Sequence, residues 1–114
     1  MLEQVEISKL EQYIGGQVTI SGIVEKIEDH GGILFLEIKD LSALASAVII
    51  PDKEKAFAMA GNLKLGYLIE ISGIVKKSPS IAQAFTCEIE VETLSILSAR
   101  TRIENMIKIA SKEQ

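Results

Sequence analysis

Two strand-like segments of this chain each contain a glycine in their middle, and this feature restricts the fold more than any other. Ser21-Gly22-Ile23-Val24 recurs as Ser72-Gly73-Ile74-Val75, and each copy continues an alternating stretch rich in β-branched residues. Glycine inside a strand usually marks a bulge or a sharp bend, because the backbone can coil there without a Cβ clash. We interpret the recurrence as two similar bent strands rather than a duplication, and two such strands in one short chain indicate a small barrel.

Hydrophobic periodicity predicts five strands, at residues 17–27, 33–40, 44–50, 67–77 and 86–97. Helical segments are expected at 7–14, where two glycines close the segment, at 52–63, and at 103–110. The order of elements, with a helix between strands three and four, is that of the OB-fold, a five-stranded Greek-key barrel. We therefore expect an all-β fold with short N- and C-terminal helices. It forms a single domain over residues 1–114, with the barrel at about 14–99 and the C-terminal helix at about 101–112.

Size and composition bound the class of protein further. With 114 residues, 47% of them apolar, the chain suits one domain that can bury a core without disulfides or a structural metal. The single cysteine, Cys87, cannot form an internal disulfide, and we interpret it as a small apolar filler. One histidine leaves no set of Cys and His ligands for zinc. We therefore expect neither a metal site nor a cofactor.

Neither a secretory signal nor a membrane span is evident in the sequence. The first six residues contain no basic segment and no apolar run, and nowhere do about eighteen apolar residues follow one another. We expect a cytoplasmic protein without membrane contact.

The charge balance argues against one kind of nucleic-acid binding. The chain has 12 Lys and Arg residues against 16 Asp and Glu residues, a net charge of −4 and a pI near 5.0, and only two arginines, Arg100 and Arg102. A clamp on the phosphate backbone needs many clustered basic side chains. A strongly basic clamp is therefore excluded.

The second predicted strand carries the most informative alternation. Leu34, Leu36 and Ile38 fall on one face, while Phe35 falls on the other face with Glu37 and Lys39. Successive side chains of a strand point to opposite faces. The alternation predicts that Phe35 faces outward with the charged residues, where an aromatic ring can stack on a base.

Two segments carry a family resemblance. Residues 22–40, with the sequence GIVEKIEDHGGILFLEIKD, and residues 86–91, TCEIEV, resemble the N-terminal anticodon-binding domain of aspartyl-tRNA synthetases of class II. The patterns of that family are close to GWVxRxRDxGGLIFIDLRD and TGEIEV. The likeness covers about residues 14–97 and implies an OB-fold that binds tRNA.

The resemblance also implies roles for single residues. In the family the strand-two phenylalanine, here Phe35, stacks on an anticodon base, and such stacking is worth about 1–3 kcal/mol per base. Where the family has arginines, this chain has Lys26, Ile27 and Glu28, and its base-reading glutamine of strand three corresponds to Ser46. The departures predict weaker binding without specific reading of the aspartate anticodon, because a carboxylate repels phosphate and a single hydroxyl cannot read a base edge in a bidentate way.

In an OB barrel, nucleic acid binds the face of strands two and three and the loops joining strands one to two and four to five. The candidate nucleic-acid-binding residues are therefore Phe35, Lys26, Lys39, His30, Ser46, Lys76 and Lys77. His30 is expected in a solvated turn, where it can contact the backbone of a ligand. The alternative for the lysines is ordinary solvation of the surface, and the sequence leaves both open.

No arrangement of residues predicts catalysis. The glycine pairs precede strands, whereas a phosphate cradle opens a helix, and Asp29 and His30 are neighbours whose side chains point apart. We interpret the alternating row of Glu88, Glu90 and Glu92 as a solvated strand face. The chain has no room for a class II catalytic domain, so we expect a non-catalytic protein, either a domain cut from a synthetase or a free-standing relative. We favour the free-standing relative, because the substitutions fall on the RNA-reading positions rather than on the hydrophobic positions of the barrel.

Two hypotheses follow from the sequence. The first is an OB-fold protein that binds single-stranded nucleic acid, RNA rather than DNA, by base stacking and contacts between lysine and phosphate. The second is an OB-fold protein-interaction module that has lost nucleic-acid binding, with a partner docked on the C-terminal helix through Ile103, Met106 and Ile107.

Overall fold

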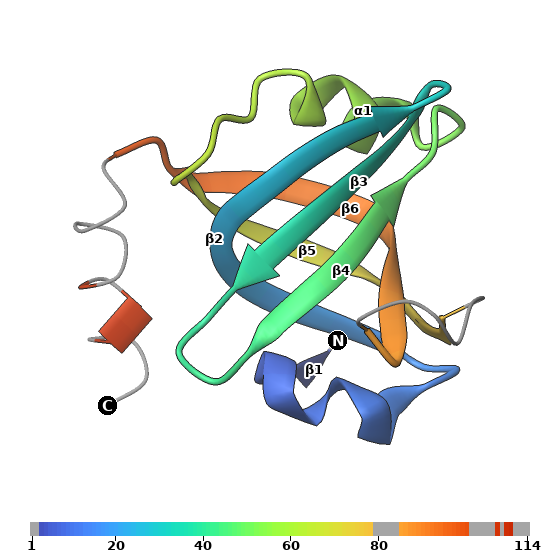
Figure 1. Ribbon diagram of the computed structural model, residues 1–114, viewed down its shortest axis with the longest axis vertical. Coiled ribbons are helices and arrows are strands. Elements are labelled where there is room, and N and C mark those ends of the chain that lie inside the picture. Colours follow the sequence, from blue (N-terminus) through green and yellow to red (C-terminus); the bar gives the residue numbers. More distant parts are fainter. Residues whose placement is uncertain (1–2, 79–84, 101–106, 108, 111–114) are drawn as a thin grey trace.

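Five strands close into a barrel in the computed structural model, which describes residues 3–78, 85–100, 107 and 109–110 (Figure 1). The barrel strands are β2 (Gln17–His30), β3 (Ile33–Lys39), β4 (Leu44–Ile49), β5 (Leu68–Lys77) and β6 (Cys87–Ser98). The sheet order is β1-β2-β3-β4-β6-β5, the pairing of β2 with β5 closes it, and β4 runs parallel to β6. The α-helix α1 (Glu54–Ala60) connects β4 to β5. The predicted OB-fold is confirmed.

The two strand glycines lie where neighbouring backbones approach closely. A Cβ atom on Gly22 would lie 2.7 Å from the carbonyl oxygen of Lys39, and one on Gly73 would lie 2.1 Å from that of Glu90. Near Gly22, β2 changes partner, since its first half pairs with β5 and its second half pairs with β3. Only glycine leaves room for these close approaches. At Gly22 the close approach allows one long strand, β2, to pair with both β5 and β3.

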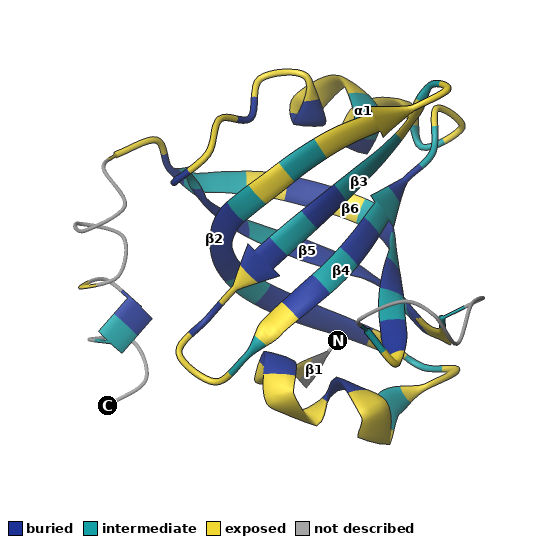
Figure 2. Ribbon diagram, in the orientation of Figure 1, coloured by how far each residue is buried: buried dark blue, intermediate teal, exposed yellow. Residues whose placement is uncertain are grey.

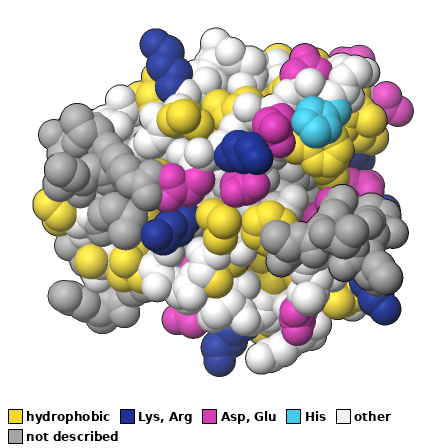
Figure 3. Space-filling model, in the orientation of Figure 1, with side chains coloured by type: hydrophobic (Ala, Val, Ile, Leu, Met, Phe, Trp, Pro, Cys, Tyr) yellow, Lys and Arg dark blue, Asp and Glu magenta, His cyan; other side chains and the backbone are white. Residues whose placement is uncertain are grey.

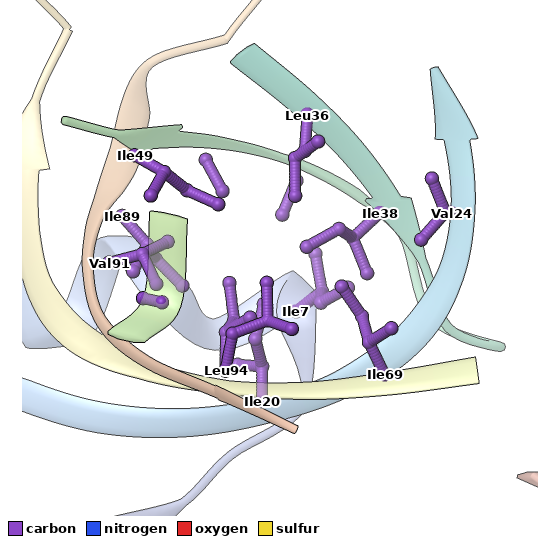
Figure 4. Close-up of a cluster of buried hydrophobic side chains, with 14 of the residues drawn as sticks. Ile7, Ile20, Val24, Leu36, Ile38, Ile49, Ile69, Ile89, Val91 and Leu94 are labelled. Carbon is purple, nitrogen blue, oxygen red and sulfur yellow. The ribbon is translucent and has the colours of Figure 1, made fainter. Parts of the chain in front are cut away.

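Buried residues recur along the barrel strands (Figure 2), and their branched aliphatic side chains converge in the barrel interior (Figure 4). Twelve large side chains are essentially inaccessible to solvent: Val18, Ile20, Ile23, Val24, Leu36, Ile38, Ile49, Ile69, Ile71, Val75, Ile89 and Val91. All but Ile23, which packs with Leu68 and Ile109 in a separate cluster, belong to the barrel core. Ile7 and Leu10 pack against this core from the N-terminal segment, and Ala56 and Ala60 pack against it from α1. Because side chains alternate between the two faces of a strand, the residues that point into the core determine which side chains lie on the outer face.

The N-terminal segment differs from the expected helix. It is a 3₁₀-helix, η1 (Ile7–Tyr13), in which Ile7 and Leu10 are buried while Ile14 is 48% exposed. In a 3₁₀-helix the residues three apart eclipse one another, so Ile7, Leu10 and the partly buried Tyr13 share the inner side and Ile14 does not. A short parallel strand, β1 (Glu3–Gln4), pairs with Val18 and Thr19 of β2. Its two polar residues carry no alternation that could have indicated it.

Asp40 joins the β3–β4 turn to η1. Its buried carboxylate accepts hydrogen bonds from the backbone N–H groups of Ile7 (3.0 Å), Ser42 (2.7 Å) and Ala43 (3.0 Å), and from the Ser42 hydroxyl (2.6 Å). The oxygens of a buried carboxylate normally accept hydrogen bonds from neighbouring groups. Asp40 therefore fixes the turn and the start of η1 together.

The β2–β3 turn is shorter than expected. β2 continues to His30, and only Gly31 and Gly32 connect it to β3, with φ angles of 67° and 91°. Glycine adopts these angles without a steric penalty. His30 is therefore a strand residue with a defined side-chain direction, and its expected place in a turn is wrong.

Of the expected C-terminal helix, residues 107 and 109–110 are described, and they are helical. Ile109 is 5% exposed and packs with Ile23, Leu68 and Leu97, whereas Ile107 is 62% exposed. Ile103 and Met106, the other members of the expected docking stripe, lie outside the described residues. None of the described helices is long and apolar enough to cross a membrane.

Candidate nucleic-acid interface

Two rows of side chains cross the outer face of the barrel, because the registers of neighbouring strands align them. The first row, read from β2 to β6, is Glu28, Phe35, Val48 and Glu90. The second row, read from β2 to β5, is Lys26, Glu37, Ser46, Glu88 and Lys76. These residues alternate along their strands with core residues such as Leu36, Ala47 and Ile89. The outer face is thus mainly charged, with one aromatic ring near its centre.

A hollow of about 350 Å³ opens on this face. The residues that line it are Lys26, Glu28, His30, Phe35, Leu36, Glu37, Ser46, Phe85 and Glu88. On this side of the molecule, basic and acidic side chains lie next to one another, and hydrophobic atoms reach the surface beside the histidine (Figure 3). We call the two rows together with this hollow the groove.

Phe35 is half-buried and forms part of the groove wall. Its ring centroid lies 5.0 Å from that of His30, with an angle of 43° between the ring planes. Such a tilted aromatic pair is a stable arrangement, and the β2–β3 pairing positions it by placing His30 opposite Ile33 and Glu28 opposite Phe35. Both rings lie where a planar ligand could stack.

The lysines of the two rows and His30 lie close to carboxylates of the same rows. The Nζ atom of Lys26 lies 3.6 Å from an Oε atom of Glu28 and 3.9 Å from one of Glu37. The Nε2 atom of His30 lies 3.7 Å from Glu28, and the Nζ atom of Lys76 lies 2.7 Å from Glu90. Two lysines face four carboxylates, so these rows carry a net charge of −2 when His30 is neutral. The groove therefore repels a phosphate backbone more than a basic OB-fold groove would.

Glu88 is the groove carboxylate whose environment most opposes ionisation. Its pKa is raised above the ordinary value, first by desolvation and then by the charge of Glu90, while Lys76 acts in the opposite direction. Loss of a proton at Glu88 adds charge to an already acidic groove. The charge of the groove therefore becomes more negative as pH rises through the raised pKa of Glu88.

The structure brings together four of the seven residues that the sequence selected. Lys26, His30, Phe35 and Ser46 line the hollow. Lys76 is the register partner of Glu88, which lines the hollow from β6. Lys39 shares the outer side of β3 but pairs with Ile23 and Leu44 at the far end of that strand. Lys77 lies opposite Cys87 at the end of β5. Neither Lys39 nor Lys77 lines the hollow.

Sequence reasoning missed Phe85 and the role of the acidic row. Phe85 lines the hollow, although it precedes β6 and belongs to no alternating strand pattern in the sequence. Glu88 and Glu90 were interpreted as a solvated face, yet both lie in the groove rows, because β6 pairs with β4. Sequence alternation could place them on the outer side, but the neighbouring strand was not evident from it.

A second hollow, of about 300 Å³, lies between η1, β4 and the start of β6 and includes Cys87. Burial, followed by the charge of Glu11, raises the pKa of the Cys87 thiol, so the thiol stays protonated and unreactive at neutral pH. In the part of the chain that the structure describes, no group of three His, Cys, Asp or Glu side chains could hold a metal ion.

Fold and face together are those of an OB-fold of the nucleic-acid-binding class, since a closed five-stranded barrel presents the aromatic ring of Phe35 on its β2–β3–β4 face. Residues 18–97 match the family model described as the OB-fold nucleic acid binding domain of the tRNA anticodon type. The chain belongs to this family.

Relatives of known activity share this domain alone. The chain is 42% identical over 69 residues to an aspartate–tRNA(Asp/Asn) ligase from Halothermothrix orenii, a match that covers 60% of this chain and 12% of the ligase. A ligase of the same name from Legionella pneumophila is 40% identical over 63 residues, or 55% of this chain and 11% of the ligase. The chain thus spans about an eighth of the length of these relatives, and the predicted resemblance to the anticodon-binding domain is confirmed.

Solved structures share the same barrel. The asparaginyl-tRNA synthetase from Pyrococcus horikoshii superposes with a TM-score of 0.76 and 25% identity, over 95% of this chain and 26% of the synthetase. The protein OBody AM3L09, solved bound to hen egg-white lysozyme, superposes with a TM-score of 0.70 and 20% identity, over 78% of this chain and 88% of its own. The latter likeness concerns the fold alone.

Proposed function

We propose that this domain binds single-stranded RNA weakly, by stacking a base on Phe35, and does not itself catalyse a reaction. The observation that carries the proposal is the half-buried Phe35 ring in the groove of an OB-fold from a nucleic-acid-binding family. RNA is preferred to DNA because the relatives are named as ligases of tRNA. Binding is weak because the carboxylates leave few cations free to contact phosphates.

The test is a fluorescence anisotropy titration with labelled RNA and DNA heptamers of mixed sequence at about 50 mM salt. We expect Phe35→Ala and Phe35→Leu to weaken RNA binding about tenfold, since each removes one stacked base. Phe35→Leu keeps an apolar side chain on β3, and an unchanged unfolding temperature would show that it keeps the fold. Absence of RNA binding, or equal binding by both variants and the unsubstituted chain, would contradict the proposal.

A second function, docking of a basic protein segment, is favoured by one observation, the net charge of −2 across the groove rows. Opposite charges on facing surfaces speed association and select partners. A lysine-rich peptide that binds the domain and is displaced by salt, combined with no RNA binding, would favour this function over the first.

A further inference from the structure

Glu28 lies directly beside the ring on which a base would stack. It is the register partner of Phe35 across the β2–β3 pair, and residues opposite one another in an antiparallel pair have Cβ atoms about 5 Å apart. Its side chain is 44% exposed and lines the same hollow. A base stacked on Phe35 therefore presents an edge to the Glu28 carboxylate.

The polar atoms around Glu28 form a defined pattern of donors and acceptors. The Lys26 ammonium, which can only donate, lies 3.6 Å from the Glu28 carboxylate and 3.9 Å from the Glu37 carboxylate, which can only accept when ionised. A base edge that spans Lys26 and Glu28 meets one donor and then the two carboxylate oxygens of Glu28. Its best complement is an edge with one acceptor followed by two donors.

Guanine has this edge, because its O6 accepts while N1–H and the N2 amino group donate. Uracil differs at the third position, where its O2 is a second acceptor and would face a carboxylate oxygen. Cytosine and adenine each offer a single amino group followed by an acceptor. Unpaired bases are read on these Watson–Crick edges in single-stranded RNA, and bonds to a charged carboxylate are the stronger ones.

We propose that Glu28 is a specificity-determining residue of the groove, and that with Lys26 it selects guanine at the base stacked on Phe35. The proposal rests on the RNA binding proposed above. Glu28 stands where the resembled synthetase domain has an arginine. The acidic side chain weakens phosphate contacts, but its carboxylate can accept hydrogen bonds from a base. Lys26 donates to O6, and the two carboxylate oxygens of Glu28 accept from N1–H and the N2 amino group.

Inosine provides the decisive probe, because its hypoxanthine base is guanine without the N2 amino group and stacks as a purine of similar size. We propose titrating the full chain with the labelled RNAs UUUGUUU and UUUIUUU, and with UUUUUUU as a reference. Guanine should bind about tenfold more tightly than inosine, the range expected of a bidentate contact with a base. Uridine at the test position should bind less tightly than guanine.

Glu28→Gln should reduce the ratio between inosine and guanine dissociation constants toward one, because an amide has a single acceptor. The matched control is Glu70→Gln, which removes the same charge from β5, where Glu70 lies beside Ser21 on the β2–β5 side of the barrel. This control should keep the tenfold ratio. Thermal unfolding of both variants checks that each remains folded.

The outcomes separate this proposal from the proposed function. If RNA binding depends on Phe35 but guanine and inosine bind equally, or if Glu28→Gln keeps the ratio, the role of Glu28 is overturned while RNA binding stands. If no RNA binds, the proposed function fails and the selectivity fails with it.

Discussion

At the scale of single residues, the groove shows how one substitution changes the kind of contact that a face can make. The Glu28 carboxylate lies 3.6 Å from the Lys26 ammonium and 3.7 Å from the Nε2 atom of His30, so one carboxylate faces two nitrogen-bearing side chains of β2. Exposed ion pairs of this kind add little to stability, about 0–1 kcal/mol. They affect ligand binding instead, because a phosphate must compete with Glu28 for the Lys26 ammonium.

Replacing Glu28 by Arg should therefore strengthen RNA binding and make it more sensitive to salt. The change alters the groove charge by two and removes one of the two carboxylates beside Lys26, so about one or two further phosphate contacts become possible. Each contact to a single strand steepens the slope of log K against log salt by about 0.7. Titrations at several salt concentrations between about 50 and 200 mM measure the slope, with Glu70→Arg as the control. A slope that matches the unsubstituted chain would contradict this account of the groove.

At the scale of elements, the β3–β4 turn and η1 depend on one buried carboxylate. Asp40 is 4% exposed and accepts four hydrogen bonds that hold the turn and the first residue of η1. The turn lies at the opposite end of β3 from Phe35, so its loss should affect stability far more than the groove. Substitutions near the two ends of β3 should therefore change the stability of the domain and its RNA binding separately.

Asp40→Ala should destabilise the domain by about 2–4 kcal/mol, because it leaves the buried N–H of Ile7 and the partly buried N–H groups of Ser42 and Ala43 without their acceptor. Asp40→Asn should cost less, since its amide oxygen can still accept from Ser42 or Ala43. Urea unfolding followed by circular dichroism measures both values. Ser42→Ala, which removes one donor and leaves the carboxylate, serves as the milder control. Equal stability of the Asp40→Ala variant would show that the turn does not depend on this carboxylate.

At the scale of the whole molecule, sequence patterns predicted the barrel better than they predicted the groove. Alternation and the strand glycines were sufficient for five strands and the intervening helix, because both signals are local. They also placed Phe35 on the outer side of β3. Which residues meet across the face depends instead on register and on the parallel pairing of β4 with β6. These long-range features brought Glu88 to the hollow and left Lys39 and Lys77 outside it.

The acidic groove of the whole domain should make both binding and stability depend on pH through Glu88. Burial and Glu90 raise its pKa in the folded state, so the native state favours the protonated form. Its contribution to stability is fully present below the pKa of the unfolded chain and is lost as pH rises through the folded pKa. Protonation also removes one negative charge from the hollow.

RNA affinity should consequently rise as pH falls through the raised pKa of Glu88. Glu88→Gln should reduce this rise and strengthen binding at pH 7 by about two- to threefold, the effect of one partly exposed charge. The same pH titration is repeated on His30→Gln as a second control, because His30 also lines the hollow. Glu70→Gln removes a charge from the β2–β5 side of the barrel and should leave the pH dependence unchanged. If Glu88→Gln keeps the pH dependence of the unsubstituted chain, protonation of Glu88 does not control RNA binding and this account of the groove is wrong.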